Sequence, residues 1–291
     1  MGCCHHDFSS GNEDKKSSGV SIPCACGHAS TLGKKQSLMR VLWAELLCHL
    51  PYTVLSVICG FVVISACDFL VLLSGHTTSH VVHGYHMLFH VFHYMHILFA
   101  VIGSHIMFMR FSKHYVVGYA VSIFGPMVLC TISDVILPAA SGVLLGMPMD
   151  MHICFFYPLD FLNMVIFAII GLCCAYALER ERVRQYSLYG IGMHFFHILS
   201  SALAALFYMV SFGFEGWVTI MGPMFLFLML SVIVPCLFSD IIVPVFAARQ
   251  IEKRSITKTT KKCTSTYQSE SAINDQIGVS QNGERHNKEE S

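Results

Sequence analysis

The residues of this chain that could do chemistry are, first of all, histidines at helical spacing. The chain holds 17 histidines, and eight of them lie between residues 76 and 105. From His76 to His96, successive histidines are separated by three or four positions, which places most of these side chains on one face of a helix. Because imidazole is the commonest metal ligand in proteins and titrates near neutrality, this face is a candidate path for metal ions or protons.

Two aspartates in apolar surroundings add a second kind of ligand. Asp134 and Asp240 are the only acidic residues of their hydrophobic segments. A carboxylate inside a membrane is costly and is a functional candidate by default, although an aspartate near a helix end can instead act as a cap. Two pairs of histidines at i, i+3 spacing could each bind one ion from a single helical face: His93 with His96, and His194 with His197.

The elements that must position these groups are membrane-spanning helices. The chain has 291 residues, of which 54% are hydrophobic and only 12% are charged, far from the composition of a soluble domain. Six hydrophobic segments are each long enough to cross a bilayer. They are residues 50–73, 87–109, 115–138, 157–178, 190–212 and 217–247. The sequence therefore predicts an all-α integral membrane protein with six transmembrane helices.

The loops between these segments differ in charge. Lys and Arg lie before the first segment, after the second, fourth and sixth, and nowhere in loops 74–86, 139–156 and 213–216. The positive-inside rule then places both termini in the cytoplasm, and we expect the cell membrane as the location. The expected partners are the lipid bilayer and a metal ion, with homo-oligomerisation left open. The basic residues mark loop ends and form no patch for nucleic acid.

Polar tails flank the transmembrane domain, which we place at residues 41–250. Residues 1–40 contain two Cys/His tracts, Cys3-Cys4-His5-His6 and Cys24-Ala25-Cys26-Gly27-His28, which are either a metal sink or sensor or chance features of a disordered tail. Residues 251–291 are polar and poor in aromatics, which predicts disorder. Cysteines within the apolar segments, such as Cys130 and Cys236, are interpreted as small buried packing residues, and His49 and His105 as interfacial or structural.

The two halves of the domain echo one another. Ser133-Asp134-Val135-Ile136-Leu137-Pro138 resembles Ser239-Asp240-Ile241-Ile242-Val243-Pro244, and His93-Tyr94-Met95-His96-Ile97-Leu98 resembles His194-Phe195-Phe196-His197-Ile198-Leu199. Weaker echoes are Gly125-Pro126-Met127 with Gly222-Pro223-Met224, and Asp68-Phe69-Leu70 with Asp160-Phe161-Leu162. Residues 41–138 and 157–250 are thus candidate inverted three-helix repeats, a plan common in secondary transporters.

Two segments are expected to depart from a plain helix. Residues 139–156 are apolar and contain Gly142, Gly146 and Pro148, which suits either a hydrophobic loop or a re-entrant hairpin. The sixth segment is overlong and interrupted by prolines, which favours kinks or an unwound stretch.

These features predict a transporter of a divalent transition metal, of the Zn, Mn, Fe, Co or Ni type, through His/Asp sites. The predicted outer site comprises His86, His90, His93, His96, Asp134 and His152. The predicted inner site comprises His194, His197 and Asp240. One set of ligands would face each side of the membrane, as alternating access requires.

Three alternatives stay open. A membrane-embedded metalloenzyme could be a di-iron oxidase or a zinc hydrolase, the latter using Ser133, Asp134 and His152. A six-helix b-type haem electron carrier could use His96 or His105 opposite His194 or His197 as axial ligands. The histidines could also serve only as interhelical hydrogen-bonding groups.

Overall fold

The computed structural model describes residues 21–23, 29–31, 38–74, 78–180, 187–213, 217–251 and 253–254. Six helices in it are long and apolar enough to cross a membrane, which confirms the predicted fold class. Their membrane-compatible spans are His49–Ser74, Val82–Phe111, Tyr115–Leu144, Pro158–Glu179, Gly192–Phe212 and Trp217–Ile251. The ends agree with the hydrophobic segments of the sequence to within five residues, except that the third span runs six residues further, to Leu144.

The first, second, fourth and fifth spans belong to single helices, whereas the third and sixth are composite. The single helices are α1 (Leu38–Ser74), α2 (Thr78–Phe111), α5 (Pro158–Arg180) and α6 (Ser187–Phe212). The third span joins α3 (Tyr115–Thr131), the π-helical turn η1 (Ile132–Ile136) and α4 (Leu137–Leu144). The sixth joins η4 (Trp217–Ile220), α7 (Met221–Leu237) and the π-helical turn η5 (Phe238–Ile242), and then stays helical to Ile251.

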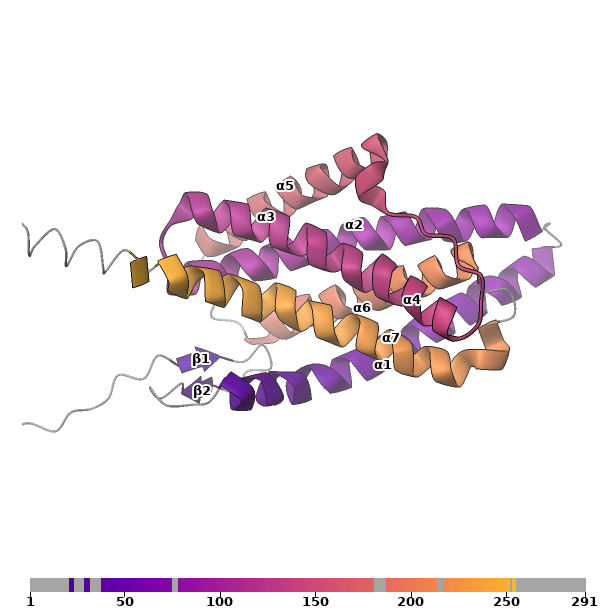
Figure 1. Cartoon of the computed structure of the whole chain (residues 1–291), viewed down its shortest axis with the longest axis horizontal. Coiled ribbons are helices and arrows are strands. Elements are labelled where there is room, and N and C mark those ends of the chain that lie inside the picture. The colour runs from indigo at the N-terminus through magenta and orange to yellow at the C-terminus, as the bar shows by residue number, and fades with distance from the viewer. Residues whose placement is uncertain are drawn as a thin grey trace, which may run out of the picture.

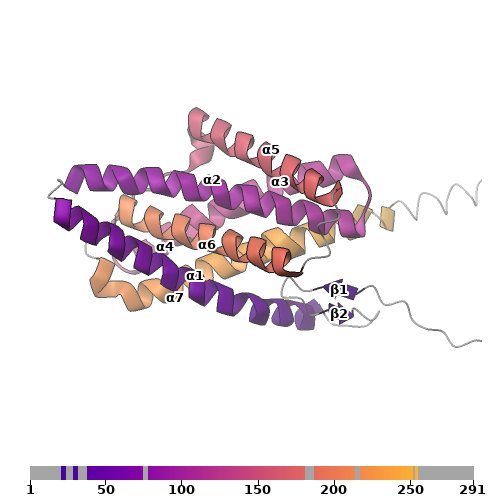
Figure 2. The same cartoon turned by 180° about the vertical axis from the view of Figure 1, so that it is seen from behind.

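Helices α2 and α6 form the centre of the bundle. In both views α5 lies along one edge and α1 along the opposite edge, with α2 and α6 between them (Figures 1 and 2). The ring of Phe92 stacks on Phe207, and Phe99 lies against Phe196, so the two central helices run antiparallel. Helix α1 packs on α6, and α5 packs on α2. Along α2, His93, His96 and His105 are buried and His86 and His90 are half-buried, whereas His83 near the start of the helix is exposed.

Close backbone approach fixes α5 against α2. A Cβ atom on Gly171 of α5 would lie 2.7 Å from the carbonyl oxygen of Leu98 and 3.2 Å from Cβ of Val101, both in α2. Glycine is needed here because any side chain would push the two helices apart. Elsewhere, Asp68 of α1 accepts hydrogen bonds from the Tyr85 hydroxyl and, at 2.9 Å, from the Trp217 indole N–H, which ties three spans together.

The segment from residue 139 to 156 does not form a re-entrant hairpin. Its first part, to Leu144, completes the third crossing as α4, and the chain then turns at Gly146, whose φ is 77°. The remainder has no regular structure until the short 3₁₀ turn η2 (Cys154–Phe156). In the sixth segment the expected irregularity is the π-helical turn η5 rather than an unwound stretch.

One end of the bundle carries the positive charge. Arg110, Lys113, Arg180 and Arg249 all fall at helix ends on this side, which we call the basic end. Two short antiparallel strands, β1 (Ser21–Pro23) and β2 (Ala29–Thr31), also lie at this end (Figure 1). The two Cys/His tracts of the amino-terminal tail and the tail beyond residue 254 lie outside the described residues. The opposite end, which we call the loop end, carries no Lys or Arg among the residues described.

Candidate metal centre

The two aspartates of the repeated motif lie in the two π-helical turns, Asp134 in η1 and Asp240 in η5. A proline, Pro138 or Pro244, follows each of them by four positions. Because proline has no N–H, it cannot bond the carbonyl of the aspartate as an α-helix requires. The helix widens instead, and the N–H after each turn bonds the carbonyl five residues back. The same short motif thus builds the same local geometry twice.

Asp134 is the acceptor for three side chains from two neighbouring helices. Its Oδ2 lies 2.8 Å from Nδ1 of His93 and 2.7 Å from Nδ1 of His96, both in α2. Its Oδ1 accepts a hydrogen bond of 3.0 Å from the Ser201 hydroxyl of α6. The carboxylate and both imidazoles are at most 1% exposed. Such a buried carboxylate is tolerable because every donor near it is used.

Asp240 has a similar but less complete environment. Its Oδ2 lies 2.9 Å from Nδ1 of His197 and 3.9 Å from Nδ1 of His194, both in α6. Its Oδ1 is buried and has no hydrogen-bond partner among the described residues. Gly103 of α2 faces this oxygen, and a Cβ there would lie 3.7 Å from it. Each carboxylate thus lies between the two central helices. Asp134 contacts the histidines of α2 and Ser201 of α6, whereas Asp240 contacts the histidines of α6 and lies beside Gly103 of α2.

The two histidine pairs meet where α2 crosses α6. The rings of His96 and His197 have centroids 4.8 Å apart. The sulfur atoms of Cys130 and Cys236 each lie 3.6 Å from Nε2 of His96. Ligand atoms of His96, His197 and Cys236, which we call the Cys236 group, all lie within 4.8 Å of one another and are buried.

A second group lies one helical turn closer to the basic end. His49 of α1, His194 and Asp240 place one ligand atom each within 4.8 Å of one another, and all three are buried. We call them the His49 group. The ring of His49 meets that of His194 edge-on, with centroids 4.3 Å apart. His49 thus belongs to the buried polar groups of the bundle, at the first residue of the membrane-compatible span His49–Ser74.

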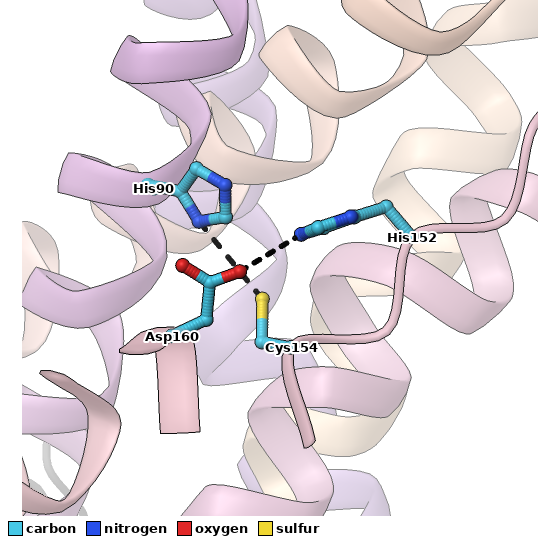
Figure 3. Close-up of side chains that lie close together, drawn as sticks. All are labelled: His90, His152, Cys154 and Asp160. Carbon is cyan, nitrogen blue, oxygen red and sulfur yellow. Dashed lines mark hydrogen bonds and ion pairs between the residues drawn. The ribbon is translucent and has the colours of Figure 1, made fainter. Parts of the chain in front are cut away.

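A third group lies toward the loop end (Figure 3). It consists of His90, His152, Cys154 and Asp160, which we call the Cys154 group, and its ligand atoms also lie within 4.8 Å of one another. Nε2 of His152 is 3.2 Å from Oδ2 of Asp160, and the sulfur of Cys154 is 3.9 Å from Nδ1 of His90. The hydroxyl of Tyr94 donates to Oδ1 of Asp160 at 3.1 Å. Figure 3 shows the four side chains converging from α2, α5 and the preceding loop.

The loop that carries His152 is fastened to α6. The hydroxyl of Tyr208 donates to the carbonyl of Asp150 at 3.0 Å and accepts from the backbone N–H of His152 at 3.3 Å, while the N–H of Asp150 bonds the carbonyl of Phe212 at 3.0 Å. Burial, with a smaller effect of the nearby carboxylate of Asp160, raises the pKa of the Cys154 thiol to about 12. A metal ion would have to displace a proton to bind this sulfur.

The structure divides the predicted outer site into separate parts. His90 and His152 join the Cys154 group, whereas His93, His96 and Asp134 lie deeper, at the helix crossing. His86 belongs to none of the three groups, although its ring lies 4.6 Å from that of His90 and 5.4 Å from that of His152.

The predicted inner residues do come together around Asp240, but they serve two groups: His197 faces the crossing and His194 faces His49. Sequence reasoning omitted several members of these groups. Cys154, Asp160, Cys236 and His49 were left out of the predicted sites, and Cys130 was interpreted as packing. A usable signal was present, because the repeat extends three residues upstream: Cys130 precedes Ser133 as Cys236 precedes Ser239.

The described structure lacks the geometry of the hydrolase alternative. Ser133 bonds Ser201 at 2.9 Å and the carbonyl of Ser231 at 3.0 Å, while His152 pairs with Asp160. The described structure therefore does not assemble Ser133, Asp134 and His152 as a hydrolase site. For the haem alternative, the pair His96 and His197 leaves no room for a haem between the imidazoles, because their ring centroids are only 4.8 Å apart.

The three groups follow one another through the interior of the bundle. His96 lies halfway along the span Val82–Phe111, with His90 nearer the loop end and His194 nearer the basic end. Each group mixes imidazole with carboxylate or thiol, a donor set suited to divalent transition metals. The protein thus has six apolar helices and buried His/Asp/Cys groups compatible with metal binding in a membrane. Comparison with protein-family models, with curated proteins and with solved structures finds no match.

Proposed function

We propose that this protein transports a divalent transition-metal cation across a membrane along the His, Asp and Cys groups inside its bundle. The observation that carries the proposal is the series of three ligand groups, the Cys154, Cys236 and His49 groups, placed successively from the loop end toward the basic end. Polar ligands inside a membrane are costly unless they line a path or bind an ion. A series of sites allows an ion to pass from one to the next without entering lipid.

The carboxylates support this function by orienting the imidazoles. A carboxylate accepts hydrogen bonds only, so each Nδ1 atom bonded to Asp134 or Asp240 must carry the proton. In the neutral rings, the Nε2 atoms of His93, His96 and His197 then keep their lone pairs. Carboxylate–histidine–metal arrangements of this kind are usual in metal sites, where the outer carboxylate fixes the ring and raises its basicity. In this proposal Asp134 acts on the ion through its histidines rather than as a direct ligand.

The positive-inside rule supports an orientation with the basic end in the cytoplasm and the Cys154 group toward the outside. The Cys154 group would then load or release the ion at the outer face, and the His49 group would do so at the cytoplasmic face. The side chains of the Cys154 group come from α2, α5 and a loop, so a small movement of that loop would open it. We propose the cell membrane as the location.

An inverted repeat would explain why the path runs between α2 and α6. In such a repeat, α1, α2 and η1 of the first half correspond to α5, α6 and η5 of the second. The packing of α1 on α6 then corresponds to that of α5 on α2, and the contact of η1 with α6 corresponds to that of η5 with α2. His96 and His197 are corresponding residues of the echo and meet at the crossing, as residues beside a two-fold axis would.

The weaker echoes do not fit this register. Gly125 lies eight residues before Ser133, whereas Gly222 lies seventeen before Ser239. Asp68 lies near the end of α1, whereas Asp160 is the third residue of α5. The proposal of an inverted repeat therefore rests on the two longer matches alone.

The test is metal flux into liposomes that contain the purified full chain and a trapped metal-sensitive fluorophore. We expect Zn²⁺ or Co²⁺ to enter faster than into empty liposomes, and we expect His96→Ala to lower the rate by at least about 10-fold. His83→Ala is the matched control, because His83 is an exposed residue of the same helix outside all three groups. Equal rates in wild type, His96→Ala and empty liposomes would refute transport. A Soret band in the purified protein would favour the haem alternative instead.

A further inference from the structure

The crossing of α2 and α6 carries a more specific inference about the transported ion. We propose that His96, His197, Cys130 and Cys236 form one two-nitrogen, two-sulfur site, and that this site selects zinc-like ions over hard cations such as Mg²⁺, Ca²⁺ and Mn²⁺. The inference deepens the proposed function and rests on it for the role of the ion as cargo. The binding site itself can be tested without any measurement of flux.

The spacing of the donors matches tetrahedral coordination. With typical Zn–S and Zn–N bond lengths and a tetrahedral angle between them, nitrogen and sulfur ligands of one ion are about 3.6 Å apart. The sulfur atoms of Cys130 and Cys236 are each 3.6 Å from Nε2 of His96. In the absence of an ion either thiol can donate to the single lone pair of this nitrogen. The two sulfur–nitrogen distances among Cys130, Cys236 and His96 therefore already have the length that a tetrahedral site requires.

His197 supplies the fourth donor. Its ligand atom lies within 4.8 Å of those of His96 and Cys236, a group that does not include Cys130, so the His197 ring or the Cys130 thiol would have to move inward for all four donors to bind one ion. Nε2 of His197 is buried and makes no hydrogen bond to any described residue. Its Nδ1 is bonded to Asp240 at 2.9 Å, so the free nitrogen is the one with the lone pair. An unsatisfied buried nitrogen of this kind is costly unless it has a ligand to bind.

Charge also favours a divalent ion with thiolate ligands at this depth. All four side chains are buried beside the crossing of the central helices, where an uncompensated charge is costly. Two thiolates offset the charge of a divalent ion within the donor set, and the two thiol protons leave as the sulfur–metal bonds form. The carboxylates of Asp134 and Asp240 stay outside that set, bonded to the far nitrogens of the imidazoles. Thiolates prefer borderline and soft ions, whereas Mg²⁺, Ca²⁺ and Mn²⁺ prefer carboxylate, carbonyl and water oxygens.

The other two groups do not offer this donor set. The Cys154 group has one sulfur, and the His49 group has none. Both of them include a carboxylate, which accepts a wider range of divalent ions. Among the described groups, the site at the crossing is thus the one that can discriminate by softness.

The experiment is a titration of the purified full chain with Co²⁺, whose visible and near-ultraviolet spectrum reports tetrahedral geometry and thiolate bonds. To silence thiols outside the bundle, the background carries serine in place of the cysteines of the tails, which are Cys3, Cys4, Cys24, Cys26 and Cys263. We expect intense tetrahedral bands and a thiolate-to-cobalt charge-transfer band, which Zn²⁺ abolishes and Mg²⁺ does not. Cys236→Ser should remove the charge-transfer band, and Cys130→Ser should at least halve it.

Matched controls are Cys173→Ser and Cys174→Ser, which replace exposed cysteines of α5 and should leave the spectrum unchanged. Size-exclusion profiles and far-ultraviolet circular dichroism show whether each variant is folded. A charge-transfer band that survives Cys236→Ser and Cys130→Ser, or that is lost only in Cys154→Ser, would overturn the site. Flux that is independent of both cysteines would overturn its role in transport but leave transport standing. A cobalt site without any flux would instead refute the proposed function.

Discussion

Cys130 and Cys236 lie in different helices, 106 positions apart in the chain, yet each places its sulfur 3.6 Å from the same nitrogen of His96. Both precede a Ser-Asp pair by three residues, and both pairs lie in π-helical turns. The local motif therefore delivers a thiol and a carboxylate to the crossing of the central helices from each half of the domain. This convergence makes the crossing, rather than either end of the bundle, the centre of the predicted chemistry.

Replacing Asp134 by asparagine tests the orienting role of the carboxylate. Asparagine keeps one acceptor oxygen but has an NH2 group in place of the other. This NH2 group would face either the Nδ1–H groups of His93 and His96 or the Ser201 hydroxyl, so the hydrogen bonds on that side would be lost or reversed. We expect Co²⁺ or Zn²⁺ affinity to fall by about 10- to 100-fold, and flux to fall with it. The measurement is a metal titration of the purified variant.

The control for that variant is Asp68→Asn, which removes a carboxylate bonded to Tyr85 and Trp217 and outside the three groups. It should lower thermal stability while metal affinity stays close to that of the wild type. If Asp134→Asn bound metal as tightly as the wild type, the carboxylate would have no orienting role.

Tyr208→Phe tests the attachment of the loop that carries His152. The variant keeps the aromatic ring but loses the hydroxyl, which bonds the carbonyl of Asp150 and the N–H of His152. We expect a loss of about 1–2 kcal/mol in local stability, seen as faster amide hydrogen exchange in residues 147–153. The metal concentration for half-maximal flux should rise while the maximal rate changes little. Tyr176→Phe, at an exposed position of α5, should change neither quantity.

Gly171→Ala tests the contact between α5 and α2. Its Cβ would lie 2.7 Å from the carbonyl oxygen of Leu98, so the helices must separate. We expect a loss of about 1–3 kcal/mol in the free energy of unfolding, measured by thermal or denaturant unfolding in detergent. In Gly192→Ala no atom outside its own helix lies within 4 Å of the new Cβ, so this variant should be neutral or more stable by up to about 1 kcal/mol. Equal stability of the two variants would contradict the close packing of α5.

Pro138→Ala tests whether the π-helical turn places the carboxylate. Alanine supplies an N–H that can bond the carbonyl of Asp134, so the turn can tighten to an α-helix and rotate the aspartate away from His93 and His96. We expect metal affinity to fall about as far as in Asp134→Asn, although the carboxylate is still present and stability is equal or higher. Pro51→Ala, which also removes a proline from inside a helix, should leave metal affinity unchanged. Unchanged affinity in Pro138→Ala would show that the π-helical turn is not needed.

The six crossings could be predicted from the sequence because hydropathy is a local property summed over some twenty residues. The sequence left residues 139–156 open between a hydrophobic loop and a re-entrant hairpin, because apolar residues with glycine and proline suit a helix end and a loop as well as a re-entrant segment. Here Gly146 simply ends the third crossing, and the rest of the segment positions His152.

The candidate site could be predicted only in part. The pairing of Asp134 and Asp240 with the i, i+3 histidines follows from the repeat, and these residues do lie together. The cysteines were not assigned, because a thiol in an apolar helix looks the same in the sequence whether it packs against lipid or faces an imidazole. The signal that distinguishes Cys130 and Cys236 is their shared place three residues before the repeated Ser-Asp pair. His49 was misjudged for a related reason: whether a residue of α1 faces the interior depends on how α1 packs against α6, a contact between distant parts of the chain.

Under the proposed function, the meeting of His96 with its counterpart His197 bears on the direction of transport. An ion arriving from the loop end would reach the crossing past Asp134, and one arriving from the basic end would reach it past Asp240. In both cases it would then meet the same imidazole pair and a thiol from the same motif. The crossing itself would therefore favour neither direction, and a preference for one direction would have to come from the different groups at the two ends of the path.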